Sequence, residues 1–313
     1  MENIELKTLY NEKLKPYLHG LEKDRLYIKK RLIGGLVLAQ VLLFGVASIT
    51  NQIVMWISIV LLLITLLWLA GTGIAKYASY RHQFKEEIVS KIINLINPDY
   101  KYDAYRQIRI NDFNAAGLFK KAEMGRGDDY VSGRIGKTVF HYSEINAGKV
   151  TDNNSNAKIQ SVFKGLFFFA DFNKTLKGET YVLPDKMEKL LGKMGQKYQS
   201  NHKKGELVKL ENPEFEKEYV VYASSQIEAR YVLTPTMMEA MTNIRKQYPF
   251  AFHFSFVGNR VNCAISFKEA LFEPKIMKSG VSYKDVEYIH HLFGLIELLI
   301  NEMNLNTRIW TKE

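Results

Sequence analysis

The hydrophobic pattern of the chain is dominated by a run without a single charged residue, from Leu32 to Ala75. A membrane-spanning helix needs about 20 apolar residues. The run contains two such stretches, residues 32–50 and 53–74, which are separated by the polar pair Asn51-Gln52. It therefore predicts a two-helix transmembrane hairpin over residues 32–75 rather than a helix pair buried in a soluble core.

The segments on either side of this run have apolar residues at helical spacing. Residues 1–31 are predicted to form a cytoplasmic N-terminal helix, in which the spacing is carried by Leu14, Leu18, Leu21 and Ile28. Beyond the second stretch, Phe84, Ile88, Ile92 and Ile96 continue the pattern until Asn97-Pro98 ends it. Residues 76–127 are predicted to be a juxtamembrane helical linker.

From Asp129 onward the pattern is typical of strands. The pairs Gly136-Lys137 and Gly258-Asn259 lie between β-prone runs and predict hairpins. The expected strands are 130–135, 138–145, 159–172, 179–183, 207–210, 218–222, 227–233, 250–257 and 260–267. The polar stretch 147–158 is expected to be a loop, and helices are expected at 185–200, after Thr234-Pro235 and at 283–303.

Hairpins mixed with few helices indicate an α+β fold. We expect a mixed cytoplasmic domain of antiparallel β-hairpins with flanking helices over residues 128–313. The pattern leaves open whether this part is one domain or two subdomains that split near residue 200.

Composition alone suggests a nucleic-acid partner, because the 313 residues carry a net charge of +10. The basic residues are, however, interleaved with acids, and part of the excess flanks the apolar run. The consecutive rings of Phe167, Phe168 and Phe169 cannot all face one side of a strand, so at least one of them is expected in the core. We therefore expect no nucleic-acid partner.

Basic residues lie at both outer ends of the apolar run, whereas the turn between the two stretches carries no charge. Lys29, Lys30 and Arg31 precede the first stretch, and Lys76 and Arg81 follow the second. Positively charged flanks stay on the cytoplasmic side of a membrane. The sequence thus predicts a multi-pass protein of the cell inner membrane, with both termini cytoplasmic and the lipid bilayer as a partner. The single cysteine, Cys263, excludes an intramolecular disulfide and agrees with a reducing compartment.

Two motifs resemble functional signatures without completing them. Residues 133–138 end like a phosphate-binding P-loop, but Val131 stands where the motif needs its first glycine, and a strand pattern follows. Glu287 and His290 have the E-x-x-H spacing of di-iron helical bundles, but the sequence contains no second copy. We therefore expect no cofactor.

Glu228 and Arg230 are the candidate contact residues of the domain. In a strand they would share one face, because they alternate with apolar neighbours. Two interpretations remain open, namely a charge pair that orders the domain and a contact with a ligand or partner.

An enzyme acting on a membrane-associated substrate is the alternative function. Its candidate groups are Asp128, Asp129, Asp171, Glu228 and His141. This hypothesis requires two or more of them to converge in one pocket with perturbed pKa values.

Three segments resemble a known family. They read DDYVSGRIGKTVFHYSEI at 128–145, VFKGLFFFADFNK at 162–174 with TYVLPD at 180–185, and EFEKEYVVYASSQIEARYVLTP at 214–235. Together they resemble a bacterial family of two-transmembrane-helix membrane proteins catalogued as a domain of unknown function, over most of residues 80–275. The resemblance implies the hairpin topology and a bacterial source, and it transfers no catalytic residue. It also implies a LemA-like membrane protein as a partner.

No complete catalytic constellation is present in the sequence. We therefore expect a non-enzymatic binding or scaffold module for a membrane-associated protein or ligand. Its partner is expected to be another membrane protein or a second copy of the chain.

Overall fold

The chain divides into two compact units. A computed structural model describes residues 2–47, 51–151, 158–172, 175–185, 204–248, 250–267, 270–278 and 282–303. The helical unit comprises Met1–Ile96 and Phe272–His291, and the sheet unit comprises Asn97–Leu271 and Leu292–Glu313. The fold class is α+β, as predicted, with long N-terminal helices and an antiparallel sheet.

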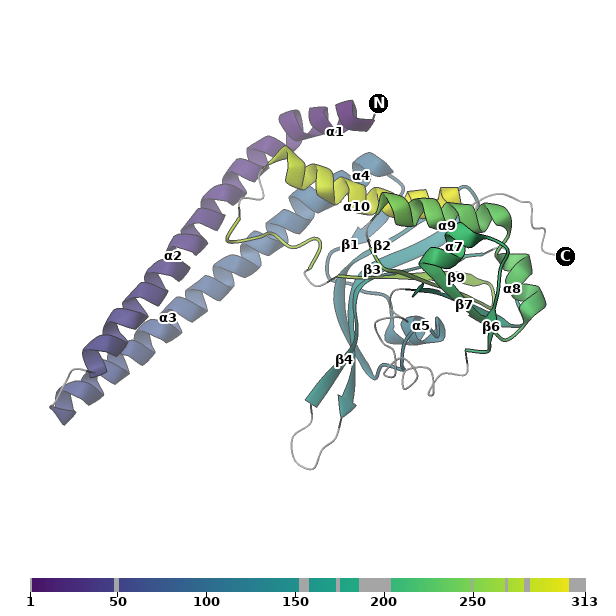
Figure 1. The fold of residues 1–313 in the computed structure, drawn as a ribbon. Helices are drawn as coiled ribbons and strands as arrows, with labels where there is room; N and C mark the ends of the chain where they lie inside the picture. Colours follow the sequence, from purple (N-terminus) through teal and green to yellow (C-terminus); the bar gives the residue numbers. More distant parts are fainter. Residues whose placement is uncertain are drawn as a thin grey trace. The chain divides into compact units, whose positions relative to one another are not determined.

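The N-terminal helices follow one another almost without interruption (Figure 1). In chain order they are α1 (Glu2–Leu9), the π-helical turn η1 (Tyr10–Leu14), α2 (Lys15–Ala47), α3 (Gln52–Phe84), the π-helical turn η2 (Lys85–Val89) and α4 (Ser90–Ile96). Helices α2 and α3 lie side by side. Asn51 caps α3, because its side-chain oxygen accepts hydrogen bonds from the amides of Ile53 and Val54 at 3.0 and 3.4 Å.

The predicted helical spacing marks the buried side of these helices. Leu14, Leu18, Leu21 and Ile28 are all buried, and so are Phe84, Ile88 and Ile92 further along the chain. The helical predictions for residues 1–31 and 84–96 are therefore confirmed, including the end of the helix before Asn97-Pro98.

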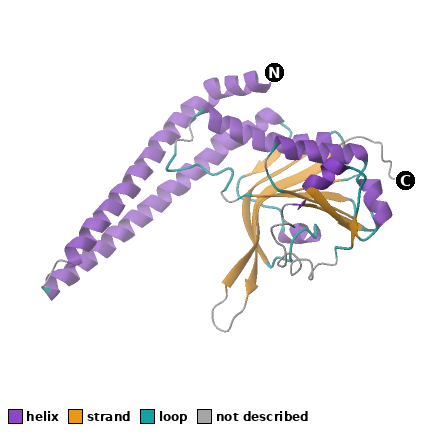
Figure 2. Ribbon diagram, in the orientation of Figure 1, coloured by secondary structure: helices purple, strands orange, loops and turns teal. Residues whose placement is uncertain are grey.

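In its described residues, the sheet unit is built on nine antiparallel strands in the order β1-β2-β3-β4-β9-β8-β5-β7-β6. Figure 2 shows them in orange. The strands are β1 (Lys101–Asp103), β2 (Met124–Ile135), β3 (Thr138–Thr151), β4 (Lys158–Asp171), β5 (Glu179–Pro184), β6 (Glu206–Val208), β7 (Tyr219–Ala223), β8 (Phe252–Val257) and β9 (Arg260–Ser266). This one sheet contains strands from both sides of residue 200.

Helices cover both faces of the sheet. They are α5 (Ile110–Ala115), α7 (Pro213–Glu218), α8 (Gln226–Val232), α9 (Pro235–Gln247) and α10 (Tyr283–Glu302), of which α10 begins in the helical unit and continues into the sheet unit. On one face, the Phe113 ring of α5 lies 5.2 Å from the Phe167 ring. On the other face, the Phe293 ring of α10 lies 5.8 Å from the Tyr142 ring. Burial on both faces explains why β8 does not alternate between apolar and polar residues.

The predicted hairpin turns and the start of α9 are confirmed. Gly136 and Gly258 have φ angles of 57° and 61°, so each begins a two-residue turn that a side chain would strain. The Thr234 hydroxyl caps α9 by accepting a hydrogen bond from the amide of Met237 at 3.3 Å.

Two predictions about the sheet unit were wrong. Residues 227–233 do not form a strand but lie in α8, because the Ser225 hydroxyl caps a helix by accepting from the Glu228 amide at 3.3 Å. Residues 147–151 are not a loop, because β3 continues its pairing with β4 as far as Thr151. The helix predicted at 185–200 lies almost wholly outside the described residues.

Candidate functional site

The apolar stretches of α2 and α3 leave many large side chains exposed. On α2, Leu36 and Phe44 are 65% and 78% exposed, and on α3 the values for Ile53 and Leu67 are 72% and 73%. In the part of the chain that the structure describes, one helix, Gln52–Ile96, is long and apolar enough to cross a membrane. Only 6% of its most apolar 18-residue stretch is buried. Soluble monomers rarely expose apolar patches larger than a few hundred Å². This helix pair therefore presents an unusually large number of exposed apolar side chains.

Two of the basic residues predicted to flank the membrane form ion pairs within the helical unit. Lys76 Nζ lies 2.8 Å from the Asp24 carboxylate. The Arg81 Nε donates to both carboxylate oxygens of Glu273, at 2.6 and 2.7 Å. Their charges are therefore partly neutralised by the protein itself.

The three basic residues before the first apolar stretch have different surroundings. Lys29 donates to the backbone carbonyl of Met277 at 3.3 Å, and Lys30 is exposed. The guanidinium of Arg31 lies 4.0 Å from the ring centroid of Trp68, which is a cation–π contact between α2 and α3.

Two further cations of the helical unit are buried and paired. Arg25 is 5% exposed, and its Nε and Nη2 donate to the two carboxylate oxygens of Glu22 at 2.8 and 2.6 Å. This hydrogen bonding raises the pKa of Arg25. The Lys85 Nζ is fully buried and lies 3.2 Å from Glu273. Sequence reasoning missed Glu273, because it lies in a segment without hydrophobic periodicity.

The structure places Glu228 and Arg230 on α8 and gives each its own partner. The Glu228 carboxylate accepts hydrogen bonds from the amides of Lys177 and Gly178 at 3.1 and 2.5 Å. The Arg230 Nη2 donates to the carbonyl of Lys209, just beyond β6, at 3.3 Å. Glu228 thus fixes the turn before β5, and Arg230 covers a carbonyl at the edge of the sheet.

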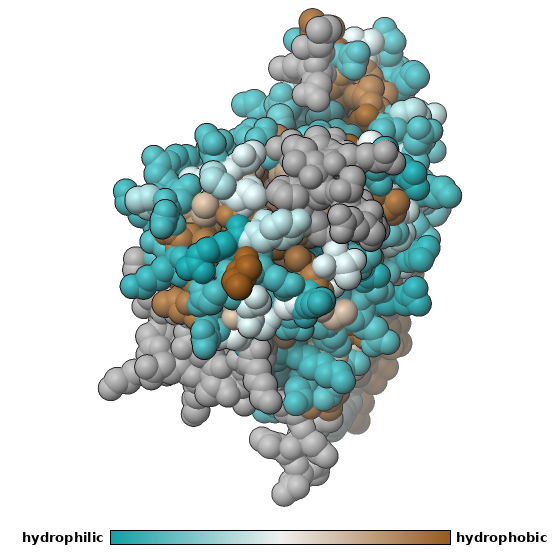
Figure 3. All heavy atoms as spheres, turned by 90° about the vertical axis from the view of Figure 1, so that its right-hand side faces the viewer, coloured by the Kyte–Doolittle hydropathy of each residue, from teal (hydrophilic) through white to brown (hydrophobic). Residues whose placement is uncertain are grey.

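The exposed surface of α8 is partly apolar. Ile227 is 82% exposed and Tyr231, one turn later, is 50% exposed. Figure 3 views the molecule from the side on which Figure 1 shows α8, where a few apolar residues lie among polar neighbours. Glu228 and Arg230 are therefore bordered by side chains that a partner could bury.

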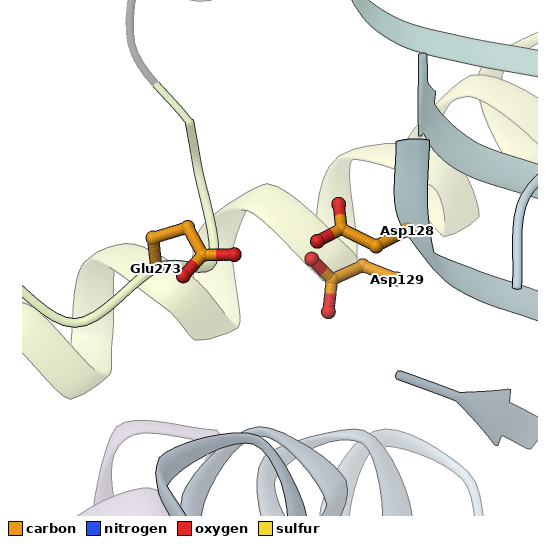
Figure 4. A group of neighbouring side chains, drawn as sticks. All are labelled: Asp128, Asp129 and Glu273. Carbon is orange, nitrogen blue, oxygen red and sulfur yellow. The ribbon is translucent and has the colours of Figure 1, made fainter. Parts of the chain in front are cut away.

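The aspartates considered for catalysis lie in β2 and β4. Asp128 and Asp129 are adjacent at the irregularity of β2, where Asp129 has a φ of 55° (Figure 4). Asp129 is fully buried, and its Oδ1 accepts the hydroxyl of Tyr102 at 2.6 Å. Asp171 ends β4 opposite Arg260 of β9. Figure 4 also labels Glu273, which belongs to the helical unit and is described with it above.

His141 belongs to a row of aromatic and charged side chains across the sheet. Its Nδ1 lies 2.7 Å from the Tyr130 hydroxyl, and its ring lies 4.7 Å from that of Phe169. The Arg260 guanidinium lies 4.5 Å from the Phe169 ring and donates to Asp112 at 2.9 Å. Burial, followed by the charge of Arg260, lowers the pKa of His141, which keeps the imidazole neutral at pH 7.

Of the candidate catalytic groups, the register thus brings His141 and Asp171 to the same face of the sheet. His141 pairs with Phe169, and Asp171 lies two residues beyond Phe169. Glu228 lies on α8, where loop amides engage its carboxylate.

The two incomplete motifs lie in a hairpin turn and on a helix. Gly136-Lys137, at the end of the segment that resembles a P-loop, is the turn between β2 and β3. Glu287 and His290 are partly buried on α10. Cys263 is 1% exposed in β9, and burial raises the pKa of its thiol, so it is poorly reactive.

One lysine of the sheet unit was not anticipated from the sequence. The Lys204 Nζ donates to the carbonyl of Leu118 at 2.9 Å and lies 5.1 Å from the Tyr181 ring centroid. Burial lowers its pKa to about 8. No sequence pattern distinguishes Lys204 from neighbouring lysines, because its burial arises from contacts distant in the chain.

Comparisons with known proteins match parts of the chain. A search of curated proteins gave no match. The crystal structure of the mycobacterial trehalose monomycolate transport factor A, TtfA, is similar at a TM-score of 0.36 and 8% identity, over 70% of this chain and 97% of that one. A likeness of this size supports no statement about fold or function. Residues 161–305 match the model of the family described as "Protein of unknown function (DUF3137)". The predicted resemblance to a domain of unknown function is therefore confirmed for this segment, which contains two of the three segments that carried it.

Proposed function

We propose that the protein is integral to the cell inner membrane, which α2 and α3 cross as a hairpin, and that the sheet unit is a cytoplasmic binding or scaffold module. The observation that carries the proposal is the exposure of large apolar side chains on two adjacent helices. From Ile53 to Ile74, at about 1.5 Å per residue, α3 provides the roughly 30 Å that a bilayer core requires.

The proposed orientation rests on the distribution of charge along the pair. Basic residues lie only at the outer ends of the apolar stretches, and the turn at Asn51 carries no charge. Since positively charged flanks stay cytoplasmic, both termini and the sheet unit are assigned to the cytoplasm.

Cysteine accessibility tests this topology. Cys263 is buried and poorly reactive, so it can remain in place while Asn51→Cys and Ile227→Cys are introduced singly. A membrane-impermeant maleimide should label Asn51→Cys in intact cells and Ile227→Cys in inverted vesicles only. Labelling of Asn51→Cys from the cytoplasmic side alone would overturn the proposal.

We further propose that α8 contacts the partner, a membrane-associated protein for which a LemA-like protein and a second copy of this chain are the candidates. Ile227 and Tyr231 supply exposed apolar surface beside Glu228 and Arg230. A binding function is favoured over the enzyme alternative because Glu228 and Asp129 are engaged by separate structural partners.

The partner contact can be tested by crosslinking in native membranes. The double variant Ile227→Ser and Tyr231→Ser should lose a crosslinked complex that the unchanged protein forms. Ile159→Ser is the matched control, because Ile159 is 60% exposed elsewhere in the sheet unit. Equal loss with the control, or unchanged crosslinking in the double variant, would exclude α8 as the contact.

A further inference from the structure

Two arginines of the helical unit, Arg25 and Arg81, bind a carboxylate with the same edge of the guanidinium. In both Arg25 and Arg81 the Nε and Nη2 atoms face a glutamate, Glu22 and Glu273 respectively. This edge offers two parallel N–H groups, whose geometry matches the two oxygens of a carboxylate or a phosphate.

In Arg31 the same edge has no acceptor within the described ranges of the chain. Its Nη1 donates to the Tyr27 hydroxyl at 2.8 Å, and the face of its guanidinium lies over Trp68. The Nε and Nη2 atoms are shielded from solvent and have no hydrogen-bond partner among the residues that the structure describes. An unsatisfied buried donor is unfavourable, and more so on a charged group. An acceptor from outside the described residues would satisfy both donors.

The position of Arg31 identifies the kind of anion. Leu32, the next residue, begins the exposed apolar surface of α2, and Trp68 lies within that of α3. If these surfaces contact lipid hydrocarbon, as proposed above, Arg31 lies at the level where lipid headgroups begin, and Trp68 is an aromatic residue of the same interface.

We propose that Arg31 binds the phosphate of an anionic membrane lipid through Nε and Nη2, while Trp68 and Tyr27 hold its guanidinium. The stack uses the face of the guanidinium and leaves its edge free, so both contacts can exist together. Since this edge is shielded from solvent in the structure, lipid binding requires the guanidinium to slide within the plane of its stack on Trp68 until the edge meets the headgroup. This inference rests on the proposed membrane insertion and adds a defined lipid site to it.

Retention of lipid by the full-length protein tests the site. The protein is reconstituted in nanodiscs of phosphatidylcholine with a minor fraction of phosphatidylglycerol, and retained phosphatidylglycerol is counted by native mass spectrometry after mild delipidation. Arg31→Gln should lower retention roughly tenfold or more, because a bidentate charge-assisted contact is lost. Arg31→Lys should lower it nearly as much, because a lysine keeps the charge but not the paired donors.

Lys30→Gln is the matched control. It removes the same charge from the adjacent residue, which is exposed. Retention by Lys30→Gln should equal that of the unchanged protein. Equal losses of lipid in Lys30→Gln and Arg31→Gln would indicate diffuse electrostatic attraction instead of a defined site, and would overturn the proposal. Unchanged retention in Arg31→Gln would overturn it as well.

Two further measurements distinguish a failure of the lipid site from a failure of the proposed membrane insertion. Inorganic phosphate added at concentrations that saturate phosphate sites should not displace the lipid, whereas displacement would identify a free-phosphate site and overturn the lipid assignment. Carbonate extraction of the unchanged protein checks the membrane insertion independently. If the protein is released by carbonate, the proposed function and the lipid site both fail. If it stays in the membrane and Arg31→Gln retains its lipid, the lipid site alone fails.

Discussion

The two units contain the same kinds of apolar residue but bury them differently. In the sheet unit, Phe254 and Phe256 are completely buried, because helices cover both faces of the sheet. In the helical unit, Leu67 and Trp68 are 73% and 61% exposed. The sheet unit removes its apolar surface from water with its own chain, whereas α2 and α3 leave large apolar side chains exposed. The comparison teaches that hydrophobic composition alone does not distinguish residues buried in a protein core from residues on an exposed apolar surface.

The largest effect is expected from a cavity in the sheet unit. Phe167 is completely buried, and its ring packs on Phe113 at 5.2 Å. Phe167→Ala should lower the free energy of unfolding by about 3–5 kcal/mol, since it loses both hydrophobic transfer and packing. Hydrogen exchange of β4 and β9 in detergent should report this loss.

Two exposed positions serve as controls for Phe167→Ala. Ile159→Ala on the same strand and Leu67→Ala on α3 should each change the stability of the sheet by less than about 0.5 kcal/mol. A loss as large at Leu67 would mean that α3 is part of a protein core, which would remove the difference between the two units.

A charge in the apolar surface of α3 should give the next largest effect. Leu63 is 54% exposed and lies near the middle of the apolar stretch. Leu63→Arg should make membrane insertion less favourable by roughly 2.5–3.5 kcal/mol, as measured for arginine at the centre of a spanning helix. The measurement is the fraction of protein that resists carbonate extraction.

The neutral change Leu63→Ala separates charge from packing. It should leave the carbonate-resistant fraction nearly unchanged. Unaltered extraction of Leu63→Arg would show that this surface of α3 does not contact lipid.

The buried histidine of the sheet unit should make its stability depend on pH. His253 is 5% exposed, and burial lowers its pKa to about 4, below the value of about 6.5 in an unfolded chain. As the pH falls, the unfolded state therefore takes up the proton first. The contribution of the neutral His253 to the free energy of unfolding is complete above about pH 6.5. It declines as the pH falls towards 4 and is smaller by about 2 kcal/mol at pH 5.

Denaturant unfolding of the sheet at pH 7 and pH 5 measures this decline. His253→Gln should show a smaller decline than the unchanged protein, because it has no group to protonate at this position. The pKa of His141 is lowered as well, so part of the decline should remain. An identical decline in His253→Gln would refute the assignment to His253.

The elements that the sequence predicted best are those with strong local signals. The hairpins at Gly136 and Gly258 and the helix start at Thr234 depend on a few adjacent residues, and all were found as expected. The segment 227–233 was misassigned because a strand and a short capped helix differ little in seven residues. The cap at Ser225 was the available signal.

The side-chain arrangements could not be predicted in the same way. Glu228 meets the amides at residues 177 and 178, and Arg81 meets Glu273, across separations of about 50 and 192 residues. Such contacts depend on how distant elements pack. The edge of Arg31 that lacks an acceptor could not be predicted either. The sequence places Arg31 before the apolar stretch but does not reveal its stack on Trp68.

The smallest expected effects come from the helix caps, and the stability cost of losing a cap should also differ between the two units. Thr234→Ala removes the hydrogen bond to the Met237 amide and should cost about 1 kcal/mol, since α9 packs on the sheet and its first turn is partly buried. Asn51→Ala removes two such bonds, yet the proposed position of Asn51 in a solvated turn lets water replace them. Its cost should be about 0.5 kcal/mol or less. Thr234→Ser keeps a hydroxyl and should restore most of the stability. A loss at Asn51 that exceeds the loss at Thr234 would mean that the turn is buried, and would place it against protein rather than at the far surface of a membrane.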